Sequence, residues 1–478
     1  MSKVGTVLVS GHFNILHPGH LRLFRAAKEY GERLVVAVKS DRLAGLAAHL
    51  PEHLRLDGVL SNGLVDEAFI YDENISDLIA RIRPDVVVKG KEYELIFNPE
   101  FASLQIYGGL LVFSSGETIF SSLDLIRKEF QNFELRSISL PVEYFSRHSI
   151  IKDNLIEFVE KFSNLRICVV GDLIVDEYIS CEPLGMSQED PTIVVMPVDT
   201  VQFLGGAGIV AAHAAGLGGQ VNFFSVTGSD VAREYALSKF VEFGVACHLL
   251  VDQSRPTTLK QRYRSKGKTL LRVSHLHQGA ISGALQKKLL GAIELVLGDT
   301  DLLVFSDFNY GCLPQSFVQQ LVEMAKSHGV FLAADSQSSS QMGDISRFKG
   351  MDLITPTERE ARISTRNRED GLVVLAEQLR QQAAASNVLL KLGEDGVLIH
   401  AGDGKSPGWL TDRIVALNSS PKDVAGAGDS LLIVSAMVLA SGGSIWEAAV
   451  LGSLAAAVQV GRLGNTPLRS VELLGELA

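Results

Sequence analysis

Residues 6–20, TVLVSGHFNILHPGH, place a short apolar run directly before three histidines and a Pro-Gly turn. The segment that follows, LRLFRAAKEYGERLVVAV, has the spacing of an amphipathic helix and then of a second strand. A strand that leads into a helix in this way is half of a βαβ unit, in which the helix covers one face of a parallel sheet. The stretch therefore predicts an α/β fold with polar side chains at the junction of strand and helix.

The composition excludes several classes of function. The 478 residues include 46% hydrophobic and 21% charged residues, and the formal net charge is −11. This balance is typical of a globular protein, and the negative charge argues against a general binder of nucleic acids or anionic membranes. The four cysteines, Cys168, Cys181, Cys247 and Cys312, lack metal-ligand or redox spacing, which indicates a reduced, cytoplasmic protein. The apolar tract 431–461 is interrupted by Ser and Gly at 441–444 and predicts two buried helices.

Strand-like and helical runs alternate along nearly the whole chain, which is long enough for more than one core. A first series, TVLVS, RLVVAV, DEAFIY, DVVVKG and GLLVFS, leads to an α/β unit ending near residue 129. A second series begins with LRICVVGD at 165–172 and continues with VNFFSVTG, DLLVFSDF, VFLAADS, DLITPT and NVLLKLG. We expect two doubly wound parallel-sheet domains, residues 1–130 and 149–478, with a connector at 131–148.

The histidine-rich junction has the chemistry of an anion site. Ligands of α/β sheets bind at the carboxyl edge of the strands, where a helix N-terminus offers unpaired N–H groups and a positive dipole end. His17 and His20 stand three residues apart around the Pro-Gly turn and could donate to the same phosphate. Two such donors suit an α-phosphate whose charge grows during nucleotidyl transfer. A lone histidine would more often be structural, whereas this pair favours a functional role.

The stretch HFNILHPGH resembles the HxGH motif of the cytidylyltransferase-like nucleotidyltransferases. The likeness extends over residues 1–128 through LVVAVKSD, RPDVVVKGKEY and ETIFSSLDLI. The family implies a Rossmann-like domain in which His17 and His20 stabilise the transferring phosphoryl group. The resemblance also implies nucleotide or phosphate contacts from Phe13, Asn14, Lys89, Ser121 and Ser122, while Arg55 aligns loosely with a family arginine.

Each of these contacts has a structural alternative. Lys89 alone would be a solvated strand end, and the two serines would be a plain helix cap, which is compatible with phosphate binding. Asn14 stands where the family usually has Asp, and Leu123 replaces a hydroxyl residue. These departures leave the base of the nucleotide, ATP or CTP, open.

Near the other end of the chain, DVAGAGDS at 423–430 precedes the apolar run LLIVSAMVLA. A Gly-Ala-Gly turn before a helix lets backbone N–H groups approach an anion without obstruction from side chains. Asp429, just after the turn, can accept the proton of a substrate hydroxyl while that oxygen attacks a γ-phosphate. The stretch therefore predicts a phosphoryl-transfer site, against the alternative of a chance glycine-rich turn.

This turn resembles the DTxGAGD motif of the ribokinase or PfkB sugar kinases. The stretches VVGDLIVDEY, FLGGAGIVAAHAAGLGG, FSDFNYG, LITPTEREA and LLKLGEDG resemble that family in the same order. The resemblance makes Asp429 the catalytic base and brings Mg²⁺ with the nucleotide, without direct protein ligands. It implies an anion hole of Gly426, Ala427 and Gly428, nucleotide contacts from Glu360, Lys391 and Gly393, and substrate contacts from Asp172, Asp176, Gly205, Gly206 and Asp307.

Several positions depart from the kinase family. The replacements are Ile209, His213, Tyr310, Gln337, Thr357 and Ala425, of which the first two take the place of asparagines in the sugar-binding helix. An apolar side chain cannot donate to a sugar hydroxyl, and a site that lacks such a bond discriminates poorly. Either the sugar differs from the family norm, or this kinase is impaired.

A PfkB kinase joined to an HxGH transferase resembles the bifunctional family of ADP-heptose synthesis, with the order of the two domains reversed. The resemblance implies phosphorylation of a sugar phosphate at its anomeric hydroxyl, then nucleotidyl transfer to the sugar 1-phosphate with release of pyrophosphate. It also implies ATP and Mg²⁺, a separate phosphatase between the two steps, and a homodimer. Two alternatives stay open: an active transferase whose kinase fold is a regulatory sugar-phosphate module, and a scaffold without catalysis.

Overall fold

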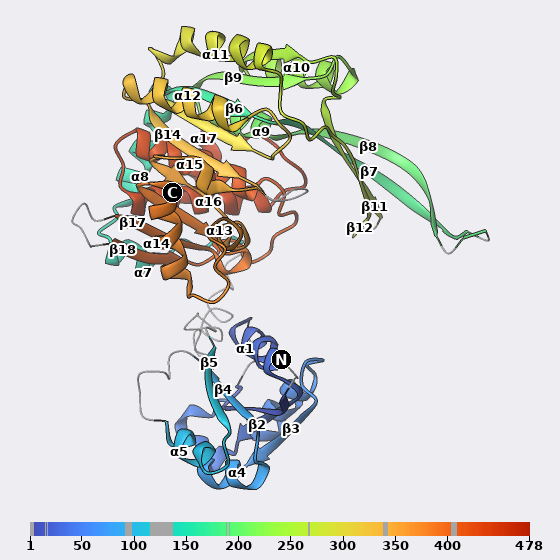
Figure 1. Cartoon of the computed structure of the whole chain (residues 1–478), viewed down its shortest axis with the longest axis vertical. Helices are drawn as coiled ribbons and strands as arrows, with labels where there is room; N and C mark the ends of the chain where they lie inside the picture. The colour runs from blue at the N-terminus through green and yellow to red at the C-terminus, as the bar shows by residue number, and fades with distance from the viewer. Residues whose placement is uncertain are drawn as a thin grey trace. The chain divides into compact units, whose positions relative to one another are not determined.

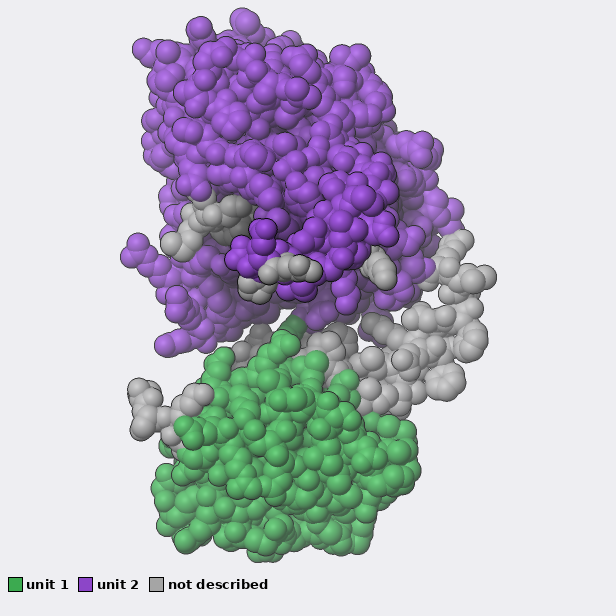
Figure 2. Space-filling view, turned by 90° about the vertical axis from the view of Figure 1, so that its right-hand side faces the viewer, with its two compact units in different colours: residues 1–136 green, residues 137–478 purple. Residues whose placement is uncertain are grey.

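The computed structural model describes residues 4–14, 16, 18–90, 98–114, 137–187, 189–190, 192–265, 268–337, 343–402 and 409–478. The chain divides into two compact units, residues 1–136 and 137–478, which Figure 2 colours green and purple. All four cysteines fall within the described ranges and are free. In those ranges we find no helix with the length and apolar character needed to cross a membrane.

The described strands of the first unit form a five-stranded parallel sheet in the order β3-β2-β1-β4-β5 (Figure 1). The strands are β1 (Val4–Gly11), β2 (Gly31–Lys39), β3 (Glu67–Tyr71), β4 (Val86–Gly90) and β5 (Leu110–Ser114). The helices are α1 (Pro18–Tyr30), α2 (Asp41–Ala44), α3 (Glu52–Leu60), α4 (Ile75–Ile82) and α5 (Pro99–Gln105). Strand β1 is central, with Val7 and Val9 in one core cluster and Leu8 in the other, which explains its continuous apolar run.

The second unit is built on a nine-stranded sheet with the order β10-β9-β6-β13-β14-β15-β16-β17-β18 in the described residues. Its strands are β6 (Arg166–Gly171), β9 (Gln220–Thr227), β10 (Ala246–Val251), β13 (Leu302–Asp307), β14 (Phe331–Ser336), β15 (Leu353–Ile354), β16 (Asn387–Lys391), β17 (Val397–Gly402) and β18 (Trp409–Ile414). Pairing is parallel from β10 to β16, and the last two strands are antiparallel to their neighbours. The predicted α/β class with two doubly wound sheets is confirmed, with an antiparallel edge in the second unit.

Helices cover both faces of this sheet. They are α7 (Val142–Arg147), α8 (Lys152–Lys161), α9 (Ala207–Gly216), α10 (Val231–Glu242), α11 (Gly283–Leu297), α12 (Gln315–Ser327), α13 (Glu358–Thr365), α14 (Leu372–Ala383), α15 (Ala427–Ala440), α16 (Ile445–Val460) and α17 (Ser470–Leu477). Core residues of α9, α15 and α16 pack on one face, and those of α11, α12 and α14 pack on the other. Helices α15 and α16 are the two buried helices predicted for the tract 431–461.

A second, four-stranded sheet, which we call the arm, extends from this unit (Figure 1). It contains β7 (Leu173–Met186), β8 (Ile193–Gly206), β11 (Thr258–Ser265) and β12 (Lys268–His275), in the order β12-β11-β7-β8. The sequence did not predict the arm. Much of it is exposed, so its strands lack the clean alternation of apolar and polar residues that marks a half-buried strand.

Part of the expected connector packs on the second unit. Helix α7 buries Tyr144, whose ring lies 6.4 Å from that of Trp446, and Ile138 forms a β-bridge with Asn418. Residues 137–148 therefore belong to the second unit, because their apolar side chains are buried there.

Candidate active site

The carboxyl ends of parallel strands bring the polar residues of the second unit together. Asp172 follows β6, Asp307 ends β13, Gln337 follows β14, and Lys391 ends β16. Because these strands are parallel neighbours within one sheet, their carboxyl ends share an edge, which is where ligands of such folds bind. Helix α15 brings the Gly-Ala-Gly turn and Asp429 to the same place, as the contacts below show.

The turn has the geometry of an anion hole. Gly426 precedes α15 with a φ of +77°, and a Cβ there would lie 2.3 Å from Asn465 Oδ1. A Cβ on Gly428 would lie 3.2 Å from Lys391 Nζ, which places this cation directly beside the turn. The backbone N–H groups at the N-terminus of α15 and the Lys391 ammonium can therefore face the same phosphate. Ala427 lies between the two glycines as the first residue of α15.

Asp429 lies in the first turn of α15 and is only 5% exposed. Its Oδ1 accepts a hydrogen bond of 3.1 Å from Gln337 Nε2. Burial, together with the carboxylate of Asp335, raises the pKa of Asp429 to about 7, while Lys391 acts in the opposite direction. A carboxyl whose pKa lies near neutral pH is well matched to general-base catalysis.

A buried ion pair lies close to Asp429. Lys391 Nζ is 2.8 Å from Asp335 Oδ2. Burial opposes the charge on Lys391, but Asp335 and Glu360 raise its pKa. Burial raises the pKa of Asp335 to about 6 despite the nearby ammonium. Lys391 thus lies among three buried carboxyl groups, Asp335, Glu360 and Asp429.

Glu360 and Gly393 have clear local roles. Thr357 and Glu360 form a capping box at the start of α13, in which the Thr357 N–H donates to Glu360 Oε2 at 2.7 Å. Gly393 has a φ of +65° and begins a short 3-10 helix, Gly393–Asp395. Thr357, which stands where the family has an asparagine, therefore serves here as a helix-capping residue. The nucleotide contacts of Glu360 and Gly393 stay predictions.

The arm carries the predicted substrate contacts Asp176 and Gly205. Asp176 on β7 is 5% exposed, and Arg262 Nη2 on β11 lies 3.4 Å from its Oδ1. Burial raises the pKa of Asp176. A Cβ on Gly205 would lie 2.3 Å from Asp176 Oδ2, so this strand can approach the carboxylate only without a side chain. Gly206 has a φ of +57° and precedes α9.

Replacing Gly205 by alanine is expected to raise the KM for the sugar substrate about tenfold, or ~1.4 kcal/mol. The added methyl group must displace the Asp176 carboxylate, which it would approach to 2.3 Å. The KM for ATP should change much less, because Asp176 lies on the arm side of the site. Initial rates of ADP release measure both constants. Gly283→Ala, where a Cβ meets nothing within 4 Å, is the matched control.

Asp172 and Asp307 use their carboxylates within the protein. Asp172 accepts three backbone N–H bonds, from Phe308 and Tyr310 at 2.9 and 3.1 Å and from Cys312 at 3.1 Å. Asp307 accepts from Ser336 Oγ at 2.7 Å and from Arg347 at 2.8 Å. Both residues therefore shape the loop after β13, and direct substrate contacts from them stay predictions.

The replaced asparagine positions of α9 lie in the core. Ile209 and His213 are both 0% exposed, and His213 Nδ1 accepts a hydrogen bond of 3.0 Å from the Leu468 N–H. Burial lowers the pKa of His213 to about 3, so this histidine is neutral. Neither side chain is available to a sugar, which agrees with the expectation that α9 provides no amide donor here.

Sequence reasoning did not single out three groups of the site. They are Asp335 and the two arm residues Lys260 and Tyr178. Asp335 pairs with Lys391, and Lys260 influences the pKa of both Asp176 and Asp429. The alternating cations in LKQRYRS at 259–265 are the sequence signal that could have indicated a strand facing a charged ligand.

In the first unit, the residues around the HxGH-like stretch form a hydrogen-bonded loop. Asn14 Nδ2 donates to the Ala47 carbonyl at 2.8 Å, and its Oδ1 accepts from the His49 N–H at 2.9 Å. Arg55 is 1% exposed and donates to Asp41 Oδ1 at 2.6 Å and to the His12 carbonyl at 2.7 Å. Asn14 and Arg55 thus support the loop rather than offer free donors.

Three further predicted residues of this unit lie within the described residues. The ring of His20, on α1, contacts that of Phe13 edge-on, with centroids 5.1 Å apart, and Phe13 has a φ of +49°. Lys89 at the end of β4 donates to Asn98 Oδ1 at 2.7 Å and to the buried Glu100 carboxylate at 2.8 Å. The charge of Lys89 is therefore balanced within the protein. His17, Ser121 and Ser122 lie outside the described residues.

These features define a class of protein: an α/β phosphoryl-transfer enzyme with a buried carboxylate beside a glycine-rich helix N-terminus. The chain belongs to the pfkB family of carbohydrate kinases, whose model matches residues 164–470. Residues 8–110 match the cytidylyltransferase-like model, so that segment precedes the kinase in this chain.

Similar proteins agree with this assignment. The chain is 32% identical over 323 residues to the bifunctional protein HldE of Desulfatibacillum aliphaticivorans, a match that covers 67% of this chain and 64% of that protein, less than two thirds of its length. It is 30% identical to the D-beta-D-heptose 7-phosphate kinase of Bordetella bronchiseptica, over 66% of this chain and 97% of that one.

Solved structures show the same fold. Phosphofructokinase-2 of Escherichia coli matches with a TM-score of 0.54 at 17% identity, covering 66% of this chain and 98% of that chain. The ribokinase of Thermotoga maritima matches with a TM-score of 0.52 at 20% identity, covering 66% and 99%. The ribokinase-like fold of the second unit is therefore established.

Proposed function

We propose that the chain is a bifunctional enzyme of NDP-sugar synthesis, of the ADP-heptose type. The buried Asp429 beside the Gly-Ala-Gly turn and Lys391 is the observation that carries the kinase half. The cytidylyltransferase-like match over residues 8–110 supports the nucleotidyltransferase half. The names of the relatives, HldE and heptose 7-phosphate kinase, support a heptose phosphate as the substrate.

In the kinase reaction, Asp429 takes the proton of the anomeric hydroxyl while that oxygen attacks the γ-phosphorus of ATP, and ADP leaves. The N–H groups of the turn and Lys391 stabilise the negative charge on the phosphate. Mg²⁺ bound with the nucleotide would neutralise charge on the phosphoryl oxygens. Asp335 fits such an ion, because its buried Oδ1 makes no hydrogen bond in the described part of the chain and carboxylate oxygens are preferred magnesium ligands.

In the transferase reaction, the phosphate of a sugar 1-phosphate attacks the α-phosphorus of an NTP, and pyrophosphate leaves. His17 and His20 are proposed to stabilise the charge that develops on the α-phosphate. Lys89 and Asn14 already bond to other groups of the protein, so the histidines carry this proposal. A separate phosphatase acts between the two steps, because the kinase product keeps its original phosphate.

One observation favours a second function, a kinase fold that binds sugar phosphate as a regulatory module. Ile209 and His213 lie in the core, so α9 offers no amide donor to a sugar. The retained Asp429, with its pKa raised to about 7, favours catalysis instead. The two functions differ in whether ADP is released.

The test follows both reactions on one purified chain with Mg·ATP or Mg·CTP. Heptose 7-phosphate, heptose 1-phosphate and other sugar phosphates are scored for release of ADP and of pyrophosphate. Asp429→Ala should abolish only ADP release, and the double variant His17→Ala/His20→Ala should abolish only pyrophosphate release. Pyrophosphate without ADP, across the whole panel, would refute the kinase half and support the regulatory module.

Replacing His20 alone by alanine is expected to lower kcat for pyrophosphate release about a hundredfold, the usual effect of removing one donor to a developing charge. The His20 ring contacts that of Phe13 edge-on, so the Tm of the variant is measured beside its rate to show that it folds. His53→Ala, at an exposed position of α3, is the control. Equal rates in the His20 and His53 variants would remove His20 from the transferase site.

A homodimer is also part of the proposal. Large apolar side chains are exposed along β7 and β8 of the arm, and a second copy of the chain would cover them. They are Leu184, Met186, Ile193, Val194, Met196, Val198 and Val201. No nucleic-acid or membrane partner is proposed, since the net charge of −11 disfavours both.

A further inference from the structure

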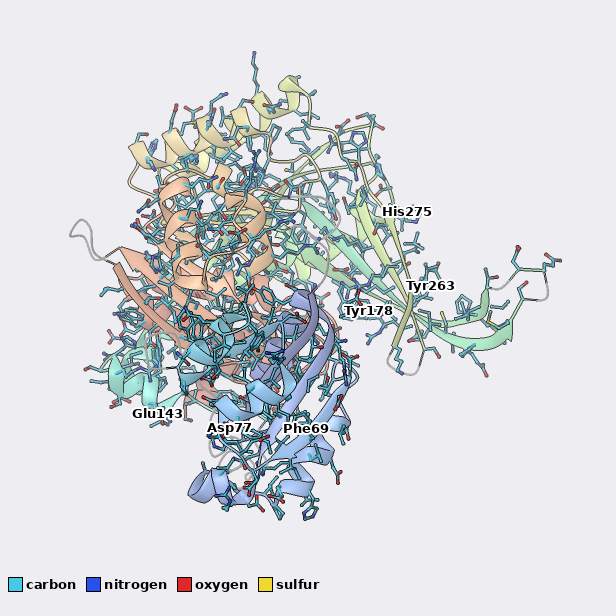
Figure 3. All side chains as sticks on the ribbon, turned by 60° about the horizontal axis from the view of Figure 1, so that its bottom comes forward. Phe69, Asp77, Glu143, Tyr178, Tyr263 and His275 are labelled. Carbon is cyan, nitrogen blue, oxygen red and sulfur yellow. The ribbon has the colours of Figure 1, made fainter. Side chains whose placement is uncertain are left out.

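A hydrogen bond between two side chains joins the arm to the glycine-rich turn. Tyr178, labelled in Figure 3, lies on β7 two residues after Asp176, so both side chains point to the same face of the strand. The Tyr178 hydroxyl donates to Asp423 Oδ2 at 3.0 Å. Asp423 is the first residue of the stretch 423–430, which contains the Gly-Ala-Gly turn and Asp429. The bond therefore connects the strand of a predicted sugar contact with the segment of the predicted base.

Asp423 uses both of its carboxylate oxygens to hold the backbone around the anion hole. Oδ1 accepts a hydrogen bond of 3.1 Å from the Ala425 N–H, and Oδ2 accepts one of 3.2 Å from the Gly464 N–H. Gly464 directly precedes Asn465, whose Oδ1 would lie 2.3 Å from a Cβ on Gly426. Because the turn and the loop around Gly464 meet at this carboxylate, a shift of Asp423 would move both backbones.

The arm holds Tyr178 in a fixed orientation. Arg262 Nη1 donates to the Tyr178 hydroxyl at 3.0 Å, so this oxygen accepts one hydrogen bond while it donates another. The guanidinium groups of Arg262 and Arg264 lie 5.1 and 5.0 Å from the centre of the Tyr178 ring, close enough for cation–π interactions. The ring of Phe203, on β8, lies edge-on to that of Tyr178 with centroids 5.2 Å apart. The hydroxyl is therefore preorganised to donate to Asp423.

The contact between arm and turn is closely packed and shielded from water. A Cβ on Gly464 would lie 2.3 Å from the Phe203 ring, so this loop can approach β8 only without a side chain. Tyr178 is 8% exposed, and the side chain of Asp423 is 11% exposed. A hydrogen bond to a charged group stabilises more than one between neutral groups, and it is stronger where water is excluded. The bond between Tyr178 and Asp423 is therefore strong enough to affect the position of the turn.

We propose that Tyr178 is a positioning residue of the anion hole, which fixes the Gly-Ala-Gly turn through Asp423 in the orientation that receives the phosphates of the nucleotide. The inference rests on the proposed kinase function. It gives a residue of the arm a role toward the nucleotide, whereas Asp176 and Gly205 of the arm are predicted to contact the sugar. Tyr178 acts through Asp423 rather than through a contact with either substrate.

Calorimetry with a non-hydrolysable ATP analogue and Mg²⁺, on the full chain and without sugar, tests the proposal. Tyr178→Phe keeps the ring but removes the hydroxyl, and it should raise the Kd of the analogue about tenfold. Tyr235→Phe is the matched control, because it removes a hydroxyl that donates to the carbonyl of Gln202 on the arm strand β8. A merely structural role in the arm would raise the KM for the sugar, as in Gly205→Ala, and leave this Kd unchanged. Equal Kd values in the two tyrosine variants would overturn the positioning role.

A double-mutant cycle determines whether Tyr178 acts through Asp423. Asp423→Asn keeps the shape of the side chain but removes the charge that strengthens the bond from the tyrosine. When Tyr178→Phe is added to Asp423→Asn, the Kd of the analogue should rise less than about twofold, because the two changes remove the same interaction. If the two changes multiply in full, Tyr178 reaches the nucleotide by another route and the proposal is wrong.

Hydrogen–deuterium exchange separates this inference from the proposed function, since it requires neither nucleotide nor turnover. The Ala425 and Gly464 amides donate to Asp423, and both should exchange about tenfold faster in Tyr178→Phe than in the wild type or in Tyr235→Phe. If the wild type releases no ADP with any sugar phosphate, but the exchange and the Kd change as stated, the positioning role stands and the kinase function fails. Unchanged exchange at both amides would overturn the positioning role, whatever the rate of ADP release.

Discussion

Asp429→Asn should lower kcat for ADP release about a thousandfold, while the KM for ATP changes little. Asparagine keeps the shape of the side chain and can still bond to Gln337, but it cannot accept the proton of the attacking hydroxyl. Asp153→Asn, an exposed carboxylate in the first turn of α8, is the control for charge. A variant that retains more than a tenth of the rate would show that another group removes the proton.

We expect the same residue to set the pH dependence of ADP release. Asp429 must be ionised to act as a base, and its pKa is raised to about 7 in the free protein. The kcat/KM for the sugar substrate should therefore rise with pH up to about 7 and then level off. A profile that is already flat at pH 5 would contradict this environment for Asp429.

Stability should change in the opposite sense to activity. The pKa of Asp429 is higher in the fold than its ordinary value of 3.8, so the folded state holds the proton more tightly than the unfolded chain does. Its favourable contribution is complete below pH 3.8 and is lost as the pH rises through about 7. Asp429→Asn should therefore have a higher Tm than the wild type at pH 8, and the difference should shrink toward pH 4.

The fold and the place of the glycine-rich turn beside Asp429 could be predicted because they depend on local sequence signals. Apolar strands buried on both faces, such as the run containing Leu8, appear as continuous hydrophobic stretches. The glycines of 423–430 indicate a turn that a side chain would obstruct, and Asp429 follows from its place after that turn. Local patterns of this kind require no knowledge of distant contacts.

The rest of the site depends on contacts between distant parts of the chain. Lys391 and Asp335 form their ion pair although they lie 56 positions apart in the sequence. Gln337 and Asp429 are hydrogen-bonded although they lie 92 positions apart. No periodicity in the sequence encodes such pairs. Arg55 illustrates the same limit, since its three hydrogen bonds to Leu50, His12 and Asp41 make it part of a loop scaffold. The sequence shows only an arginine near a family position.

Lys391→Met should lower the free energy of unfolding by about 3 kcal/mol, because it leaves Asp335 buried without its partner. Solvent screening is small at this pair, since the two side chains are 13% and 2% exposed. ADP release should fall strongly as well, since the ammonium beside Gly428 no longer faces the phosphate. Lys288→Met, at an exposed position of α11, should show neither effect.

A double variant separates the structural effect of Lys391 from its role toward the nucleotide. Lys391→Met/Asp335→Asn removes both charges of the pair and should recover most of the lost stability, as measured by urea unfolding. It should not recover ADP release, because the Lys391 ammonium then no longer faces the anion hole. In the single variant the pKa of Asp429 should rise above about 7, since Lys391 opposes that rise in the wild type. The rising limb of the kcat/KM profile should therefore move to higher pH. If the double variant regains both stability and rate, Lys391 serves only to balance the charge of Asp335.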